Sequence, residues 1–207
     1  GAVMDERIAW AALAISLFYT AGMYLNDAFD AEHDRAVRPE RPIPRGLIPR
    51  RRVFVTGALL LGFGELMLVW PRASDYERLP LLAAALGLAL AACILFYSWR
   101  HKRDPFSPVV MALCRALVYV ITAAWLVDRL PGQVLAGAAA LAIYVVALSQ
   151  VAKYDVLPGR SIAMMIAGIS ILDAVMVLSS TGQWGLAGLT ALGFPLTLAL
   201  QRFTPGT

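Results

Sequence analysis

The sequence has few cysteines, few histidines and little charge. Its 207 residues include 2 cysteines and 2 histidines, and 15% of them are charged. Two cysteines are too few for a disulfide-stapled secreted module, and the absence of a cluster of Cys and His speaks against a zinc site. The low charge excludes a plain soluble domain, in which about a quarter of the residues are charged, and it excludes a disordered tail.

Apolar residues dominate the chain instead. They make up 59% of the sequence, and they gather in runs close to the roughly 20 residues that a membrane-spanning helix needs. The runs are continuously apolar rather than alternating, which argues against a β-barrel. The sequence therefore predicts an all-α, polytopic membrane protein in the lipid bilayer. The seven predicted segments are Ile8–Leu25, Val53–Trp70, Pro80–Trp99, Val109–Val127, Val134–Gln150, Ser161–Ser179 and Trp184–Leu200.

The positive charges are distributed unequally between the two ends of these segments. The net charge is +4, but seven apolar segments exclude a soluble nucleic-acid-binding protein, and we expect no nucleic-acid partner. Thirteen Lys and Arg residues fall on the side of loops 26–52, 100–108 and 151–160, and four fall on the other side. Because cytoplasmic loops carry an excess of Lys and Arg, we expect these three loops in the cytoplasm and the protein in the cell (inner) membrane.

Carboxylates stand directly after the first apolar segment. At 3.6 residues per turn, Asp27, Asp30 and Asp34 fall within an arc of about 60°, with Asn26 at its edge and Glu32 pointing away. Three carboxylates on one face repel one another and require a positive partner. Oxygen ligands favour a hard cation, for which Mg²⁺ shared with substrate phosphates fits best. The alternative is a solvated, negatively charged end of a helix.

A basic, proline-rich loop follows the carboxylates. It reads Arg38-Pro39-Glu40-Arg41-Pro42-Ile43-Pro44-Arg45-Gly46, and its prolines cannot continue a helix. Carboxylates that hold Mg²⁺ beside fixed guanidinium groups form a site for a diphosphate. The alternative for the arginines is that they serve membrane topology alone.

These two stretches resemble a known family signature. Asn26-Asp27-x-x-Asp30-x-x-x-Asp34, followed by Arg41-Pro42-Ile43-Pro44-x-Gly46, resembles the first signature of the UbiA superfamily of intramembrane prenyltransferases. Tyr97-Ser98-x-x-x-Lys102-Arg103 is similar to the family's Tyr-Ser-x-x-Leu-Lys-Arg element. The resemblance implies one transmembrane prenyltransferase-like domain over residues 1–207. It also implies a bundle of nine helices around a central cavity, of which seven are visible, so we expect the domain to be incomplete at one or both ends.

The resemblance also implies an activity. We expect a Mg²⁺-dependent prenyltransferase that ionises an isoprenyl diphosphate and transfers the prenyl group to a lipophilic acceptor, which is an aromatic compound, a quinone precursor or a lipid. The expected catalytic residues and metal ligands are Asp27, Asp30 and Asp34. The expected contacts to the diphosphate are Asn26, Arg41, Lys102, Arg103, Arg115 and Lys153.

The sequence departs from the family at a second, Asp-x-x-x-Asp motif. Asp155 is present and is a further expected metal ligand, but Gly159 stands where the second aspartate is expected. This departure supports one alternative, a non-catalytic component that binds or transports prenyl lipids. A second alternative is a UbiA-like terpene cyclase, in which the same site ionises a prenyl diphosphate without an acceptor. His33 and His101 lie in polar stretches and are interpreted as solvated histidines.

Overall fold

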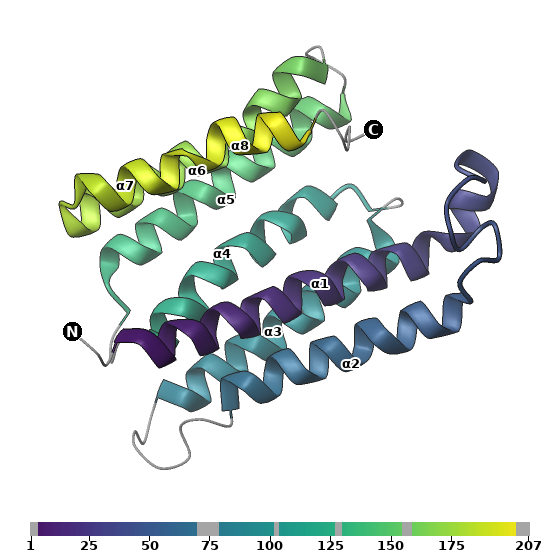
Figure 1. Ribbon diagram of the computed structural model, residues 1–207, viewed down its shortest axis with the longest axis horizontal. Coiled ribbons are helices and arrows are strands. Elements are labelled where there is room, and N and C mark those ends of the chain that lie inside the picture. Colours follow the sequence, from purple (N-terminus) through teal and green to yellow (C-terminus); the bar gives the residue numbers. More distant parts are fainter. Residues whose placement is uncertain (1–3, 70–78, 102–103, 127–129, 155–158, 202–207) are drawn as a thin grey trace. The chain divides into compact units, whose positions relative to one another are not determined.

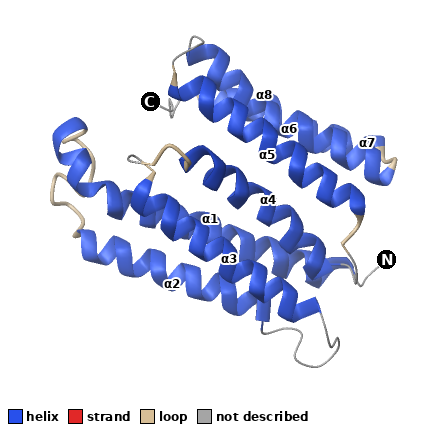
Figure 2. Ribbon diagram, turned by 180° about the vertical axis from the view of Figure 1, so that it is seen from behind, coloured by secondary structure: helices blue, strands red, loops and turns tan. Residues whose placement is uncertain are grey.

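The structure is a computed structural model that describes residues 4–69, 79–101, 104–126, 130–154 and 159–201. Within these ranges every regular element is a helix, so the predicted all-α class is confirmed (Figures 1 and 2). The helices are α1 (Met4–Val37), α2 (Arg50–Val69), α3 (Leu79–Arg100), α4 (Ser107–Leu126), α5 (Gly132–Lys153), α6 (Gly159–Thr181), α7 (Trp184–Ala191) and α8 (Gly193–Leu200).

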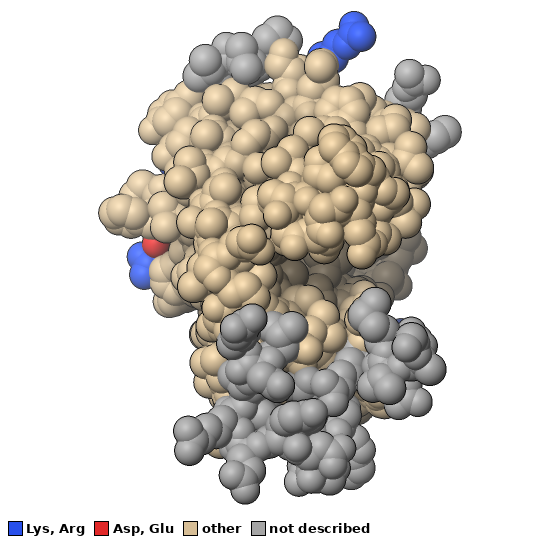
Figure 3. Space-filling view, turned by 90° about the vertical axis from the view of Figure 1, so that its left-hand side faces the viewer, with Lys and Arg blue, Asp and Glu red and all other residues tan. Residues whose placement is uncertain are grey.

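Six of these helices, α1 to α6, are long and apolar enough to cross a membrane. They correspond to the first six predicted segments. Large apolar side chains also lie on the outside of the helices, where Leu81 is 74% exposed and Ile143 is 72% exposed. Figure 3 shows a face on which nearly all described atoms belong to uncharged residues. Such a surface is suited to lipid and not to water, and the chain is an integral multi-pass membrane protein.

The seventh predicted segment is interrupted. Its residues form α7 and α8, each of 8 residues, on either side of Leu192. Pro195 in the first turn of α8 has no N–H to donate to the carbonyl group of Ala191, and a proline ring clashes with the carbonyl four residues before it. The apolar composition predicted one helix here, and the proline divides it.

The first loop is shorter than the sequence analysis placed it. Residues 26–37 continue α1, and the non-helical segment before α2 covers only residues 38–49. No glycine or proline occurs between Asn26 and Arg38, so nothing in this stretch ends the helix until Pro39. The aspartates therefore stand on a helix that continues beyond the apolar segment.

The chain forms two compact units, Gly1–Pro131 and Gly132–Thr207, which are described separately. In the first unit α1 packs along α2, and α3 packs against α4 (Figures 1 and 2). Its core includes Phe18, Leu68, Leu90, Ile121 and Trp125. In the second unit α6 contacts α5, α7 and α8.

Glycines in α2 allow α1 to approach closely. A Cβ atom on Gly57 would lie 2.9 Å from Leu25 Cγ and 3.2 Å from the Leu25 backbone nitrogen, and one on Gly64 would lie 3.1 Å from Phe18 Cδ2. Small residues bring membrane helices together in this way. The contact of Gly57 with Leu25 lies two residues before the first aspartate and so positions the acidic end of α1 against α2.

We predict that Gly57→Ala lowers the free energy of unfolding by about 1–3 kcal/mol, because the added methyl group overpacks the contact between α1 and α2. The matched control is Gly62→Ala in the same helix, where a Cβ would meet nothing within 4 Å. Thermal unfolding of the purified protein in detergent, followed by circular dichroism, measures both variants. An equal loss of stability in the two variants would contradict the close approach at Gly57.

Candidate functional site

The three aspartates lie at the end of α1 with unequal exposure. The side chain of Asp27 is 56% exposed, while those of Asp30 and Asp34 are 11% and 6% exposed. The spacing places them on one side of the helix, and the structure shows that the two later members of this face are buried. A buried carboxylate is stable only when it is paired or hydrogen-bonded.

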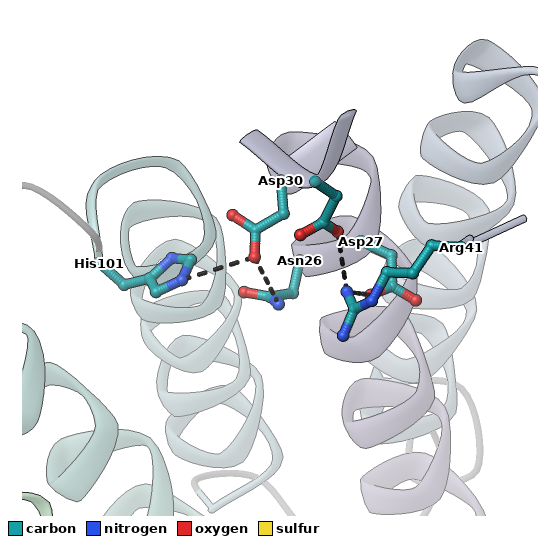
Figure 4. Close-up of polar contacts among 6 residues, drawn as sticks. Asn26, Asp27, Asp30, Arg41 and His101 are labelled. Atoms are coloured by element: carbon teal, nitrogen blue, oxygen red, sulfur yellow. Dashed lines mark hydrogen bonds and ion pairs between the residues drawn. The ribbon is translucent and has the colours of Figure 1, made fainter. Parts of the chain in front are cut away.

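Arg41 supplies positive charge to two of the aspartates. Its Nη1 donates to Asp34 Oδ2 at 2.8 Å and to Asp27 Oδ1 at 3.4 Å (Figure 4). The predicted proximity of Arg41 to the acidic face is therefore present in the structure, and the guanidinium group is itself partly shielded, with 34% of the side chain exposed.

The backbone of the loop holds Arg41 in this position. The amide of Arg38 donates to the Asp34 carbonyl at 2.8 Å, and the amide of Arg41 donates to the Arg38 carbonyl at 3.1 Å. The chain then turns at Gly46, whose φ of 75° is a conformation that favours glycine. The prolines and these turns fold residues 38–49 back towards α1.

Asp30 faces α3 and has a different set of neighbours. Asn26 Nδ2 donates to Asp30 Oδ2 at 3.3 Å, and His101 Nε2 lies 3.6 Å from the same oxygen (Figure 4). The His101 ring stacks on Tyr97, with the ring centroids 5.0 Å apart and the planes inclined by 20°. Asn26 Oδ1 is buried and has no hydrogen-bond partner among the described residues.

Arg50 fixes the other side of α1. Its Nε donates to the Ala28 carbonyl at 2.7 Å, and its Nη1 pairs with Glu32 Oε1 at 3.3 Å. The side chain of Glu32 is 77% exposed, which agrees with the prediction that it points away from the three aspartates. Arg50 therefore joins the start of α2 to the acidic end of α1 and takes no part in the cluster around Arg41.

Of the remaining predicted site residues, Arg115 and Lys153 lie in the part of the chain that the structure describes. Arg115 is exposed on α4 and is not among the cations that pair with Asp27 or Asp34 in the described part of the chain. Lys153 ends α5 in the second unit, and its Nζ lies 6.0 Å from the centre of the Tyr154 ring. Lys102, Arg103 and Asp155 lie outside the described residues.

The interpretation of His101 as a solvated histidine is wrong. Only 18% of its side chain is exposed, and it lies between Tyr97 and Asp30. Its position four residues after Tyr97 predicts one helical face for the two rings, but the contact with Asp30 depends on how α3 packs against α1. His33, by contrast, is exposed, as predicted.

The oxygen atoms of Asn26 and the three aspartates are of the type that binds a divalent cation, although the described residues do not form a complete set of metal ligands. Among the described residues, no three His, Cys, Asp or Glu side chains are grouped so that they could hold a metal ion. However, the unpartnered oxygen of Asn26 lies beside the buried carboxylate of Asp30, and carbonyl and carboxylate oxygens are the ligands of hard cations. Asp27 and Asp34 carry carboxylate oxygens of the same kind, and in the structure these carboxylates form ion pairs with Arg41.

The sequence was compared with models of known protein families. The family model described as the UbiA prenyltransferase family matches residues 2–207. The chain belongs to the UbiA prenyltransferase family. This membership confirms the resemblance seen at the acidic signature, and UbiA family prenyltransferases generally use a divalent metal.

Curated relatives of this UbiA family chain are named digeranylgeranylglyceryl phosphate synthase. The protein of Methanopyrus kandleri is 35% identical over 113 residues, which are 54% of this chain and 38% of the relative. That of Pyrococcus abyssi is 36% identical over 112 residues, again 54% and 38% of the two chains. That of Halobacterium salinarum is 31% identical over 147 residues, 70% of this chain and 50% of the relative.

The matches thus cover half or less of the length of these relatives. No solved structure matches the chain significantly. The family and the membrane-spanning fold are therefore established for this UbiA family chain, while its activity and substrates are matters for proposal.

We predict that Arg41→Gln lowers the free energy of unfolding by about 1–3 kcal/mol, because it leaves the buried Asp34 carboxylate without its charged partner. Added Mg²⁺ should recover part of the loss, since a cation can take over the neutralisation. Melting temperatures with and without Mg²⁺ measure both effects.

The control is Arg45→Gln in the same loop, where the side chain is exposed. A loss of stability in R45Q as large as that in R41Q would show that the loss reflects general loop charge and not the ion pairs of Arg41.

Proposed function

We propose that this protein is an intramembrane prenyltransferase that binds an isoprenyl diphosphate at the acidic end of α1 and transfers the prenyl group to a lipophilic acceptor. The observation that carries the proposal is the pairing of the buried Asp34 carboxylate with Arg41 at the end of an apolar, membrane-spanning helix in a UbiA family chain. A site of this kind joins a place for phosphate groups to a place for a hydrocarbon chain.

The residues of the acidic face have separate tasks in this proposal. Asn26, Asp27, Asp30 and Asp34 would hold Mg²⁺, and we include Asp155 as a further ligand. When bound, Mg²⁺ would neutralise charge on the diphosphate as the allylic C–O bond breaks. Arg41 would exchange its bond to Asp27, the longer and more exposed of its two contacts, for a diphosphate oxygen.

Further basic residues would complete the diphosphate site. From the family resemblance we assign Lys102, Arg103, Arg115 and Lys153 as additional diphosphate contacts. Their role is to stabilise negative charge that develops on the leaving group. The apolar helices would keep the prenyl chain away from water, which would otherwise react with the allylic cation.

The acceptor that we propose is based on the name of the curated relatives. Their name describes a glyceryl phosphate that carries two geranylgeranyl groups, so we propose a prenylated glyceryl phosphate as the first acceptor to test. In such an acceptor the glycerol hydroxyl oxygen would form the new C–O bond and lose its proton, and diphosphate would leave. From the charge count we propose that the stretches 26–52, 100–108 and 151–160 are cytoplasmic and that the protein lies in the cell membrane.

We predict that Asp30→Asn reduces prenyl transfer by about 100-fold or more, because it removes a buried charge that the leaving diphosphate and its cation depend on. Glu32→Gln is the control, since Glu32 is a carboxylate of the same helix that is exposed and pairs with Arg50. The assay uses membranes that contain the protein, with labelled geranylgeranyl diphosphate, Mg²⁺ and geranylgeranylglyceryl phosphate. Where the natural protein is longer than these 207 residues, the full-length protein is expressed.

The products distinguish the alternatives. A labelled ether lipid, lost on removal of Mg²⁺ with a chelator, supports the proposal. A labelled hydrocarbon or prenyl alcohol formed without acceptor would indicate a cyclase. Binding of the diphosphate without release of pyrophosphate in the presence of any quinone, phenol or lipid extract would indicate a non-catalytic lipid-binding component. Equal turnover by wild type and D30N would refute the assignment of the site.

A further inference from the structure

His101 stands where this chain departs from the family element that it otherwise resembles. In Tyr97-Ser98-x-x-x-Lys102-Arg103 the residue before Lys102 is histidine, whereas the family element has leucine at that place. A leucine can only pack there, but an imidazole can donate, accept or bind a metal ion. The substitution thus adds a chemical group to the acidic site.

The structure directs this group at the acidic site. His101 Nε2 lies 3.6 Å from Asp30 Oδ2, which exceeds the hydrogen-bond range of about 2.7–3.2 Å. Stacking on Tyr97 limits rotation of the ring. The side chains of His101 and Asp30 are both largely buried, at 18% and 11% exposed.

A further polar atom, Oδ1 of Asn26, lies beside this pair. Asn26 donates a hydrogen bond from Nδ2 to Asp30 Oδ2, and its own Oδ1 is buried without a hydrogen bond to any residue that the structure describes. In Figure 4 this oxygen lies on the side of the amide that faces His101. One imidazole nitrogen, one carboxylate oxygen and one amide oxygen thus come together from α1 and the end of α3.

The spacing suits a shared cation. Two ligand atoms at neighbouring positions around a metal ion, each about 2.1–2.3 Å from it, are about 3 Å apart. A shift of a few tenths of an ångström brings His101 Nε2 and Asp30 Oδ2 to this separation, and Asn26 Oδ1 supplies a third ligand.

We propose that His101 is a metal ligand of this chain, and that it moves the preference of the site from Mg²⁺ towards first-row transition ions such as Mn²⁺. The proposal rests on the proposed function in one respect, namely that the acidic face holds a divalent cation. Mg²⁺ strongly prefers oxygen ligands, whereas imidazole nitrogen binds transition ions more readily.

The test uses Mn²⁺ itself as the probe, bound to purified protein from which any polyhistidine tag has been removed. Pulsed electron paramagnetic resonance detects the nitrogen coupling of an imidazole that is coordinated to Mn²⁺. The chain has only two histidines, so His33→Leu is a natural control for His101→Leu. His101→Gln serves as a second variant in which an amide oxygen replaces the imidazole.

We expect the imidazole coupling in wild type and in H33L, and its loss in H101L and H101Q. The Kd for Mn²⁺ should rise by about 10-fold or more in H101L, since the loss of a group that only orients a metal ligand already costs about 10–100-fold. The Kd for Mg²⁺ should change by less than about 3-fold, because Mg²⁺ gains little from nitrogen. Circular dichroism and gel filtration verify that the variants are folded.

Three results would overturn the proposal, namely no Mn²⁺ binding by wild type, bound Mn²⁺ without imidazole coupling, or coupling that persists in H101L. In the second case His101 only positions Asp30. The outcomes are separable from those of the proposed function. Imidazole coupling without prenyl transfer would support His101 as a metal ligand and contradict the proposed prenyltransferase activity. Mg²⁺-dependent prenyl transfer without imidazole coupling would support the activity and contradict His101 as a ligand.

Discussion

The burial of Asp30 and Asp34 is the constraint on which the site depends. Removing a carboxylate from water costs several kcal/mol unless cations or donors compensate it. Asp34 is compensated by Arg41, and Asp30 accepts a hydrogen bond from Asn26 and faces His101. The fold of residues 38–49 and the position of the end of α3 both follow from this need, because each delivers a polar or charged group to one buried carboxylate.

The packing of α1 against α2 makes that burial possible. Gly57 lets the two helices approach, and Arg50 bonds the Ala28 carbonyl from the first residue of α2. These contacts lie on the side of α1 that also carries Glu32, so they leave Asp27, Asp30 and Asp34 directed towards the loop and α3. A helix that is anchored on one side and carries carboxylates on the other is suited to hold a divalent cation, through which an anionic headgroup could bind at the end of an apolar bundle.

Much of this arrangement could be predicted from the sequence, because it is local. The apolar runs predicted seven spanning segments, of which six are long spanning helices in the structure, and the spacing of Asp27, Asp30 and Asp34 placed them on one helical face. The role of His101 could not be predicted, since its contact with Asp30 joins α1 to α3 across about 70 residues of sequence. The break at Leu192 does not follow from the apolar composition of this segment but from Pro195, whose missing N–H interrupts the helical hydrogen bonds of the backbone.

The central claim is that the acidic end of α1 binds a metal-bridged diphosphate. The most direct measurement is anomalous diffraction from crystals grown with Mn²⁺ and an unreactive isoprenyl thiolodiphosphate. The account predicts an anomalous peak beside Asn26 and Asp30, with the diphosphate in contact with Arg41 and the prenyl chain along the apolar helices. A diphosphate bound elsewhere, with Arg41 still paired to both Asp27 and Asp34, would contradict it.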